Sequence, residues 1–156
     1  MMQNPHDDPA IARRRRWMGV LAQAPRETLE RAWRRFAAPP AFEWLRRPET
    51  GLVMTRGRAG GSGRRFNLGE LCVTRAAVRL EGGAVGHAYV AGRDGRRAEL
   101  AALFDALLQQ PTLHDELERE LIGPLAEAAH AAREDAARKA AATRVEFFTL
   151  VRGEDA

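Results

Sequence analysis

The segment from Glu49 to Asp94 constrains the fold of this chain more than any other. It consists of short stretches in which apolar and polar residues alternate, separated by glycine-rich turns: ETGLVMTRGRAGGSGRRFNLGELCVTRAAVRLEGGAVGHAYVAGRD. An alternation with a period of two places successive side chains on opposite faces of a strand. The segment therefore predicts an antiparallel sheet whose loops carry the function.

Four strands are expected, over residues 42–46, 52–58, 71–80 and 84–91. Pro48 should confine the end of the first strand to a sheet edge or a turn, because proline cannot donate to a strand ladder. In the second strand Leu52 and Met54 share a face with two arginines, so this face should change from buried to exposed along its length. The third strand is the clearest, with one apolar side formed by Cys72, Thr74, Ala76, Val78 and Leu80.

Helices are expected before and after the sheet segment along the chain. Two precede it, over residues 10–24 and 27–36, and are ended by prolines. After it, Asp94 should cap a helix with the amphipathic pattern Leu100, Leu103, Phe104, Leu107 and Leu108. Pro111 should stop that helix, and Thr112 with Asp115 resembles a capping box for another. An alanine-rich helix should follow Gly123-Pro124 and reach about residue 142.

The predicted fold class is α+β, a small antiparallel sheet flanked by N-terminal and C-terminal helices. Residues 1–9 are polar and are expected to form a flexible tail, and residues 10–156 a single domain. The last apolar segment, VEFFTLV, is strongly β-prone and should pair with the sheet or with a partner chain. No apolar run is long enough to span a bilayer, and the lone Cys72 cannot form an internal disulfide, so a cytoplasmic location is expected.

Charge is distributed unevenly between the two halves of the chain. Residues 1–97 carry 19 basic and 9 acidic side chains, whereas residues 98–156 carry 6 basic and 12 acidic ones. This segregation indicates a face for an anionic ligand or for an acidic protein partner. Arg13 to Arg16 followed by Trp17 resembles a nucleic-acid-binding arm, but four arginines at the start of a solvated helix fit the sequence better.

The segment RGRAGGSGRR, residues 56–65, is the best candidate for a functional loop. Its glycines allow backbone amides to turn inward, and its arginines supply forked donors, so it could cradle a polyphosphate or a phosphonate. It is not a Walker loop, because it lacks the GK[ST] ending and precedes a strand. A flexible hairpin loop with solvated arginines is the alternative, and composition alone favours it.

Other candidates lie around this loop. His87 is a possible general base, although a structural hydrogen-bonding role beside Tyr89 is the simpler interpretation, and Glu49 is expected to pair with arginines. No residues stand at metal-ligand spacing, so no metal site is predicted. The complete set of candidates for substrate binding or for an interface is Glu49, Arg56, Arg58, Gly60, Gly61, Gly63, Arg64, Arg65, Arg75, His87 and Arg93. None is assigned as catalytic.

Several blocks of the sequence resemble the PhnG family, a subunit of the bacterial carbon–phosphorus lyase core complex. They are PETGLVMTRGRAGGSGRRFNLGELCVTRAAVRL, GHAYVAGRD, ALFDALLQQ and RVEFFTLVRG. The resemblance extends from RRRRWMGVLA to the VRGEDA end and leaves only about the first ten residues without a match.

The resemblance implies a place in phosphonate catabolism, within alpha-D-ribose 1-methylphosphonate 5-triphosphate synthase. That complex displaces adenine from MgATP by an alkylphosphonate. The implied partners are PhnI, held to be the catalytic subunit, PhnH and PhnJ, and possibly PhnL. This chain is expected to bind no cofactor of its own, and MgATP is a substrate of the complex. The alternatives are a purely structural assembly subunit and, less favoured, a free nucleic-acid-binding module.

Overall fold

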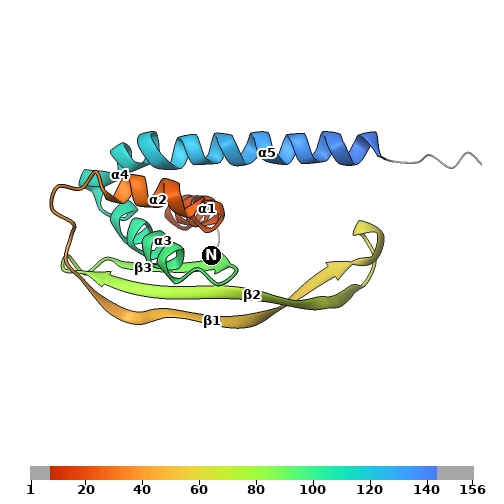
Figure 1. The fold of residues 1–156 in the computed structure, drawn as a ribbon, viewed down its shortest axis with the longest axis horizontal. Helices are drawn as coiled ribbons and strands as arrows, with labels where there is room; N and C mark the ends of the chain where they lie inside the picture. The colour runs from red at the N-terminus through yellow and green to blue at the C-terminus, as the bar shows by residue number, and fades with distance from the viewer. Residues whose placement is uncertain (1–7, 144–156) are drawn as a thin grey trace, which may run out of the picture.

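Three antiparallel strands in the order β1-β2-β3 form the base of the molecule in the computed structural model, which describes residues 8–143 (Figure 1). They are β1 (Phe42–Arg58), β2 (Arg65–Leu80) and β3 (Val85–Ala91). All the helices lie on one side of this sheet. The predicted α+β class is therefore confirmed, but the sheet has three strands in place of the expected four.

The expected first and second strands are one continuous strand, because Pro48 does not end β1. The pairing of β1 with β2 shifts register between Trp44 and Arg46 and again between Arg46 and Glu49. These irregularities absorb the proline, and β1 is an edge strand, where a missing N–H group is tolerated. Strand β2 is also longer than predicted and begins at Arg65, so that β1 and β2 form a long ladder.

Helix α3 (Gly95–Leu108) is the centre of the core. The Asp94 side chain caps it as predicted, accepting a hydrogen bond from the Arg97 amide at 2.9 Å. All five residues of the predicted apolar stripe are buried, and so are the alanines between them. The helix is buried all around because it lies between the sheet and helices α1 (Pro9–Gln23) and α2 (Arg26–Trp33).

Strand β3 and helix α3 approach each other so closely that only glycine fits at position 86. A Cβ atom on Gly86 would lie 1.9 Å from the Ala102 carbonyl oxygen and 2.7 Å from the Ala106 amide nitrogen. Both are backbone atoms, which cannot rotate away as a side chain can. This contact therefore sets the distance between the helix and the sheet.

Helix α1 covers the outer edge of β3 through a buried carboxylate. Asp105 of α3 is fully buried and accepts hydrogen bonds from the His87 amide, from the Trp17 indole N–H, both at 2.9 Å, and from the Arg14 guanidinium. Arg14 also donates to the Val85 carbonyl at 2.9 Å. Arg14 therefore does not belong to a solvated helix face, as the sequence had indicated, but closes the edge of the sheet.

The C-terminal helices follow one another without an intervening loop. They are α4 (Pro111–Leu117), a π turn (Glu118–Ile122) and α5 (Gly123–Ala142). The predicted capping box is absent, since Gln110 occupies the cap position without a side-chain bond and Pro111 begins α4. The predicted alanine-rich helix is confirmed and ends at Ala142, and it begins at Gly123, directly after the π turn. The Gly123 amide bonds to the Glu118 carbonyl, so the wider turn accommodates a proline that cannot donate to a regular helix.

Helix α5 extends beyond the other helices, and most of its second half is exposed (Figure 1). On this half, Asp135 pairs with Lys139 at 2.8 Å and with Arg138 at 3.3 Å. The predicted strand VEFFTLV lies outside the described residues. Within residues 8–143, no helix has the length and apolar character that crossing a membrane requires.

The close contact at Gly86 predicts that Gly86→Ala lowers the free energy of unfolding by about 3 kcal/mol, because the added methyl group forces β3 away from α3. The matched control is Gly51→Ala, since a Cβ there meets nothing within 4 Å. Urea unfolding of both variants measures the difference. Equal stability of the two variants would contradict the close approach.

Candidate functional site

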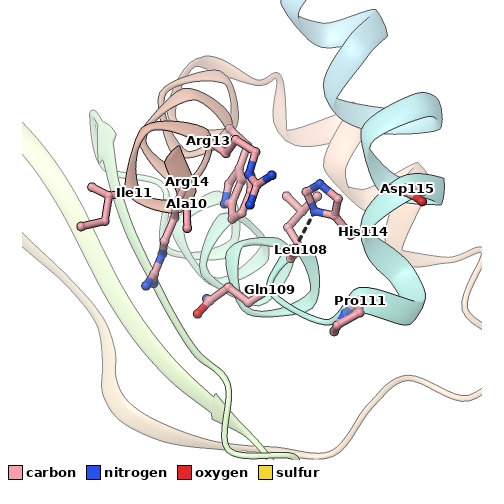
Figure 2. A pocket seen from close by; sticks show the side chains of 10 residues that line it. Ala10, Ile11, Arg13, Arg14, Leu108, Gln109, Pro111, His114 and Asp115 are labelled. Carbon is pink, nitrogen blue, oxygen red and sulfur yellow. Dashed lines mark hydrogen bonds between the residues drawn. The ribbon is translucent and has the colours of Figure 1, made fainter. Parts of the chain in front are cut away.

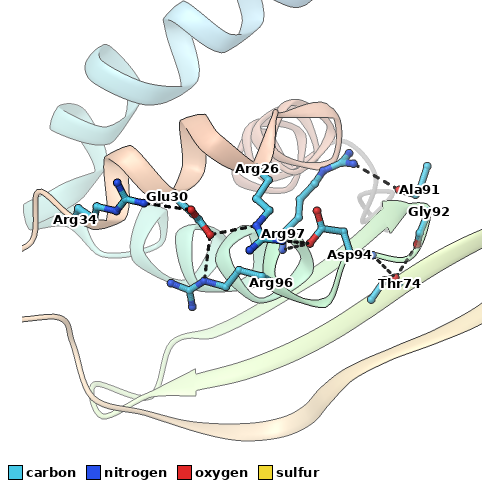
Figure 3. A network of polar contacts seen from close by, with 9 residues as sticks. All are labelled: Arg26, Glu30, Arg34, Thr74, Ala91, Gly92, Asp94, Arg96 and Arg97. Atoms are coloured by element: carbon cyan, nitrogen blue, oxygen red, sulfur yellow. Dashed lines mark hydrogen bonds and ion pairs between the residues drawn. The ribbon is translucent and has the colours of Figure 1, made fainter.

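The β1–β2 ladder continues past the end of β3 as a two-stranded arm, here defined as residues 51–72. At its base, Thr50 Oγ1 lies 3.2 Å from Thr74 Oγ1. The Thr74 hydroxyl also donates to the Gly92 carbonyl at 2.7 Å and accepts from the Asp94 amide at 3.2 Å (Figure 3). Beyond this point the arm projects past helices α1 to α4 (Figure 1). The core thus holds the base of the arm and leaves its length uncovered.

The tip of the arm is a tight turn built from the predicted glycine-rich loop. A short 3-10 turn covers Ala59–Gly61, and Gly61 has φ 81°, a conformation that favours glycine. The Gly63 amide donates to the Ala59 carbonyl at 2.8 Å, so it is engaged within the loop. The loop therefore presents arginine side chains more than free backbone amides.

Four of the predicted site residues gather at this tip: Arg56, Arg58, Arg64 and Arg65. Arg58 lies opposite Arg65 in the ladder, and its guanidinium donates to the Gly63 carbonyl at 3.2 Å. All four side chains are exposed, and no carboxylate among residues 8–143 lies within ion-pair distance of them. The tip is therefore a concentration of positive charge that no carboxylate in the described part of the chain neutralises.

Apolar side chains cover both faces of the arm. Leu52 and Met54 share a face with Arg56 and Arg58, as predicted, but they are 62% and 51% exposed, so the expected burial at the base of this face is wrong. These side chains are exposed because no helix in the described part of the chain packs against the arm. The opposite face carries Val53, Leu71, Leu68 and Phe66, all exposed. Exposed apolar groups of this size and number mark an interaction surface.

Glu49 and Arg75 lie apart from the tip, on the sheet face opposite α3. The Glu49 carboxylate accepts hydrogen bonds from Arg46 and, at 2.5 Å, from Arg75. These two bonds, that from Arg46 first, hold the pKa of the Glu49 carboxyl below its ordinary value. A hydrogen bond with Tyr89, and then that with Glu49, raises the pKa of Arg75 above its ordinary value. The predicted pairing of Glu49 with arginines is confirmed, since its carboxylate and the Arg75 guanidinium bond to each other.

The remaining candidates, His87 and Arg93, are separate from both groups. His87 and Tyr89 share an exposed face of β3, as predicted, and the His87 amide is held by Asp105. Arg93 is exposed in the turn between β3 and α3, next to Gly92. The structure therefore brings together the tip residues of the predicted site but not the whole set.

Ion pairs between the two halves of the chain neutralise part of the segregated charge. Arg14, Arg16 and Arg35 of the basic half pair with Asp105, Glu118 and Glu120 of the acidic half. At the start of α3, Glu30 lies among Arg26, Arg34 and Arg96 (Figure 3). Part of the predicted basic face is thus neutralised inside the molecule, whereas the four arginines of the arm tip have no ion pair among residues 8–143. Because Arg14 and Arg16 are paired, a nucleic-acid-binding arm at residues 13–16 is disfavoured.

A pocket with a volume of about 620 Å³ lies between α1, the end of α3 and α4 (Figure 2). Its Arg14 is engaged by Asp105, which leaves Arg13 on α1 and Asp115 on α4 as charges of opposite sign. His114 Nδ1 lies 2.8 Å from the Leu108 carbonyl, and its ring packs edge-on against Trp17. This contact of His114 with Trp17 is a packing contact. The pocket has no excess of one charge, so the arm remains the stronger candidate site.

Comparison with known proteins identifies relatives over nearly the whole chain. The family model described as phosphonate metabolism protein PhnG matches residues 12–153. A protein of Rhizobium meliloti (strain 1021) is 49% identical over 154 residues, which cover 96% of this chain and 95% of the relative. That relative is named alpha-D-ribose 1-methylphosphonate 5-triphosphate synthase subunit PhnG.

The Glu49 cluster predicts a measurable titration. NMR titration should place the pKa of Glu49 below its ordinary value of 4.5. Arg46→Gln should raise that pKa towards the ordinary value more than Arg75→Gln does, because the Arg46 bond is the larger cause. Since the folded-state pKa is the lower one, the stabilisation is present above the unfolded-state pKa and is lost as pH falls through the folded-state pKa. An unchanged Glu49 pKa in both variants would contradict this arrangement.

Proposed function

Because the chain belongs to the PhnG family of phosphonate metabolism proteins, we propose that it is a subunit of the synthase that makes alpha-D-ribose 1-methylphosphonate 5-triphosphate. Its relative of 49% identity carries that name, and the two chains cover each other almost completely. In this proposal the complex acts in the cytoplasm during phosphonate catabolism. The chain contributes as a subunit and does not carry out the chemistry alone.

The reaction we propose for the complex displaces adenine from MgATP by an alkylphosphonate. A PhnI-like subunit supplies the catalytic site, PhnH-like and PhnJ-like subunits complete the assembly, and a PhnL-like protein is a further candidate. MgATP is a substrate of the complex, and this chain holds no cofactor of its own. The absence of a catalytic constellation at the arm supports a role beside a catalytic partner.

The observation that carries the proposal is the group of exposed arginines at the end of the arm. Both the triphosphate of ATP and the phosphonate are anionic, and guanidinium groups bind such oxygens through paired hydrogen bonds. The tip arginines lack a carboxylate partner among the described residues, so they are free to receive an external anion. We propose that one or more of Arg56, Arg58, Arg64 and Arg65 reach the anion bound in the neighbouring catalytic subunit.

A structural role is the rival within the same assembly. In that case the tip arginines contact acidic surface on a partner, and no side chain of this chain touches substrate. The exposed apolar side chains of the arm favour an interface in either case. The two readings differ in what a loss of the arginines does to activity and to assembly.

The test is the double variant Arg58→Ala/Arg65→Ala in the purified complex. Loss of charge-assisted hydrogen bonds to an anion should raise the apparent KM for ATP or for the phosphonate about tenfold or more, while the subunits still co-purify. Arg58→Lys/Arg65→Lys retains charge but not the forked donor, and should recover only part of the loss.

The matched control is Arg31→Ala/Arg34→Ala, which removes two exposed arginines, one in the last turn of α2 and one at its C-cap. It should leave KM unchanged. If the arm variant has the same activity as the control, the arginines do not reach substrate. If it no longer co-purifies with the other subunits, the structural role is the correct one.

A further inference from the structure

The two outer edges of the sheet, along β3 and along β1, differ in how their backbone groups are hydrogen-bonded. At the β3 edge, the Val85 carbonyl accepts from Arg14 at 2.9 Å and from Gln109 at 2.8 Å, and the His87 amide donates to Asp105. At the β1 edge, no side chain or loop within residues 8–143 makes a hydrogen bond to the outward backbone of residues 50–58. An uncovered edge is a template for another strand.

The β1 edge is protected only in its first half. This half contains two register irregularities, a proline (Pro48) and two adjacent charged residues (Arg46 and Arg47). Such features interrupt a regular edge and prevent unwanted pairing. From Thr50 to Arg58, β1 has no proline, and its apolar Leu52 and Met54 are exposed. The only irregularity in this half places the extra residue, Leu68, on β2. The second half is therefore open to an added strand.

The ladder pattern identifies which backbone groups are open. The Gly92 amide bonds to the Cys72 carbonyl, so the backbone of Cys72 faces β3 and that of its neighbours Leu71 and Val73 faces β1. Leu71 and Val73 lie opposite Val53 and Gly51, whose backbone groups therefore face β2. The N–H and C=O groups of Thr50, Leu52 and Met54 consequently point outward.

We propose that the outer edge of β1 from Thr50 to Arg58 accepts an extended strand from another subunit of the synthase. The inference rests on the proposed function, since it needs a multi-subunit assembly. Strand addition uses backbone hydrogen bonds for affinity and alternate side chains for specificity. The added strand carries apolar side chains beside Leu52 and Met54 and a carboxylate beside Arg56, which has no acidic partner in the described part of the chain. Arg58, Arg64 and Arg65 then remain at the tip for the anion.

Amide hydrogen exchange tests this pairing directly. In the free chain the amides of Leu52 and Met54 exchange rapidly, whereas in the assembled complex they slow about a hundredfold, as expected for backbone bonds formed on assembly. Two other occupants give different results. Protection in the free chain that disappears when residues 144–156 are removed assigns the edge to the chain's own C-terminal segment. Protection that grows with concentration assigns it to a second copy. Either result overturns the proposal.

A proline substitution tests the edge by a second route. Met54→Pro removes an outward N–H group and leaves the bonds between β1 and β2 intact, so the folded chain should retain its thermal unfolding midpoint. The matched control, Met54→Thr, removes the same apolar side chain but keeps the N–H group. We expect Met54→Pro to reduce recovery of the complex about tenfold relative to Met54→Thr. Equal recovery of the two variants overturns the proposal.

The experiment separates this inference from the proposed function. If the unmodified chain elutes without the other synthase subunits, the proposed function itself fails. If the unmodified chain forms the complex but the amides of Leu52 and Met54 still exchange rapidly, only the strand addition at the β1 edge is refuted.

Discussion

The contact between helix α3 and strand β3 is the constraint on which the rest of the structure depends. Gly86 lets the two backbones meet, and the buried Asp105 joins α3 to α1 and to the outer edge of β3. A buried carboxylate is tolerable only when its oxygens are bonded, and here three donors satisfy them. With β3 closed in this way, the open edges of the described sheet are the outer edge of β1 and the part of β2 that runs past the end of β3. The two longer strands continue beyond the core as the arm.

The arm gives the chain a surface that suits a subunit of a larger assembly. Its base is fixed by Thr50, Thr74 and Asp94, while its surface displays apolar side chains and unpaired arginines. Such a surface is unfavourable in water and favourable against a partner. A rigid core that holds the base of an exposed arm therefore fits a subunit whose task is completed by its neighbours, in agreement with the family to which the chain belongs.

Sequence patterns predicted the local features and missed those that depend on distant residues. The alternation in β2, the apolar stripe of α3 and the Asp94 cap follow from spacing alone, and the clustering of arginines around the glycines predicted the tip. Pro48 lies on an edge strand, as expected, but it does not end that strand, because register shifts that no local pattern reveals absorb it. Asp105 gave one overlooked signal, a carboxylate inside an otherwise apolar helix, but its partners lie 18 to 91 residues away along the chain. The exposure of Leu52 and Met54 reflects the absence of a covering helix, which alternation cannot show.

The core is expected to fold by itself, and the arm is expected to bind the partner subunits. The most direct measurement replaces residues 52–72 by an Asn-Gly turn between Gly51 and Val73, which lie opposite each other in the ladder. Co-purification with the other synthase subunits is then compared with the unfolding midpoint of the isolated chain. The account predicts that the shortened chain keeps a cooperative unfolding transition and no longer enters the complex. A shortened chain that still assembles with its partners would contradict it.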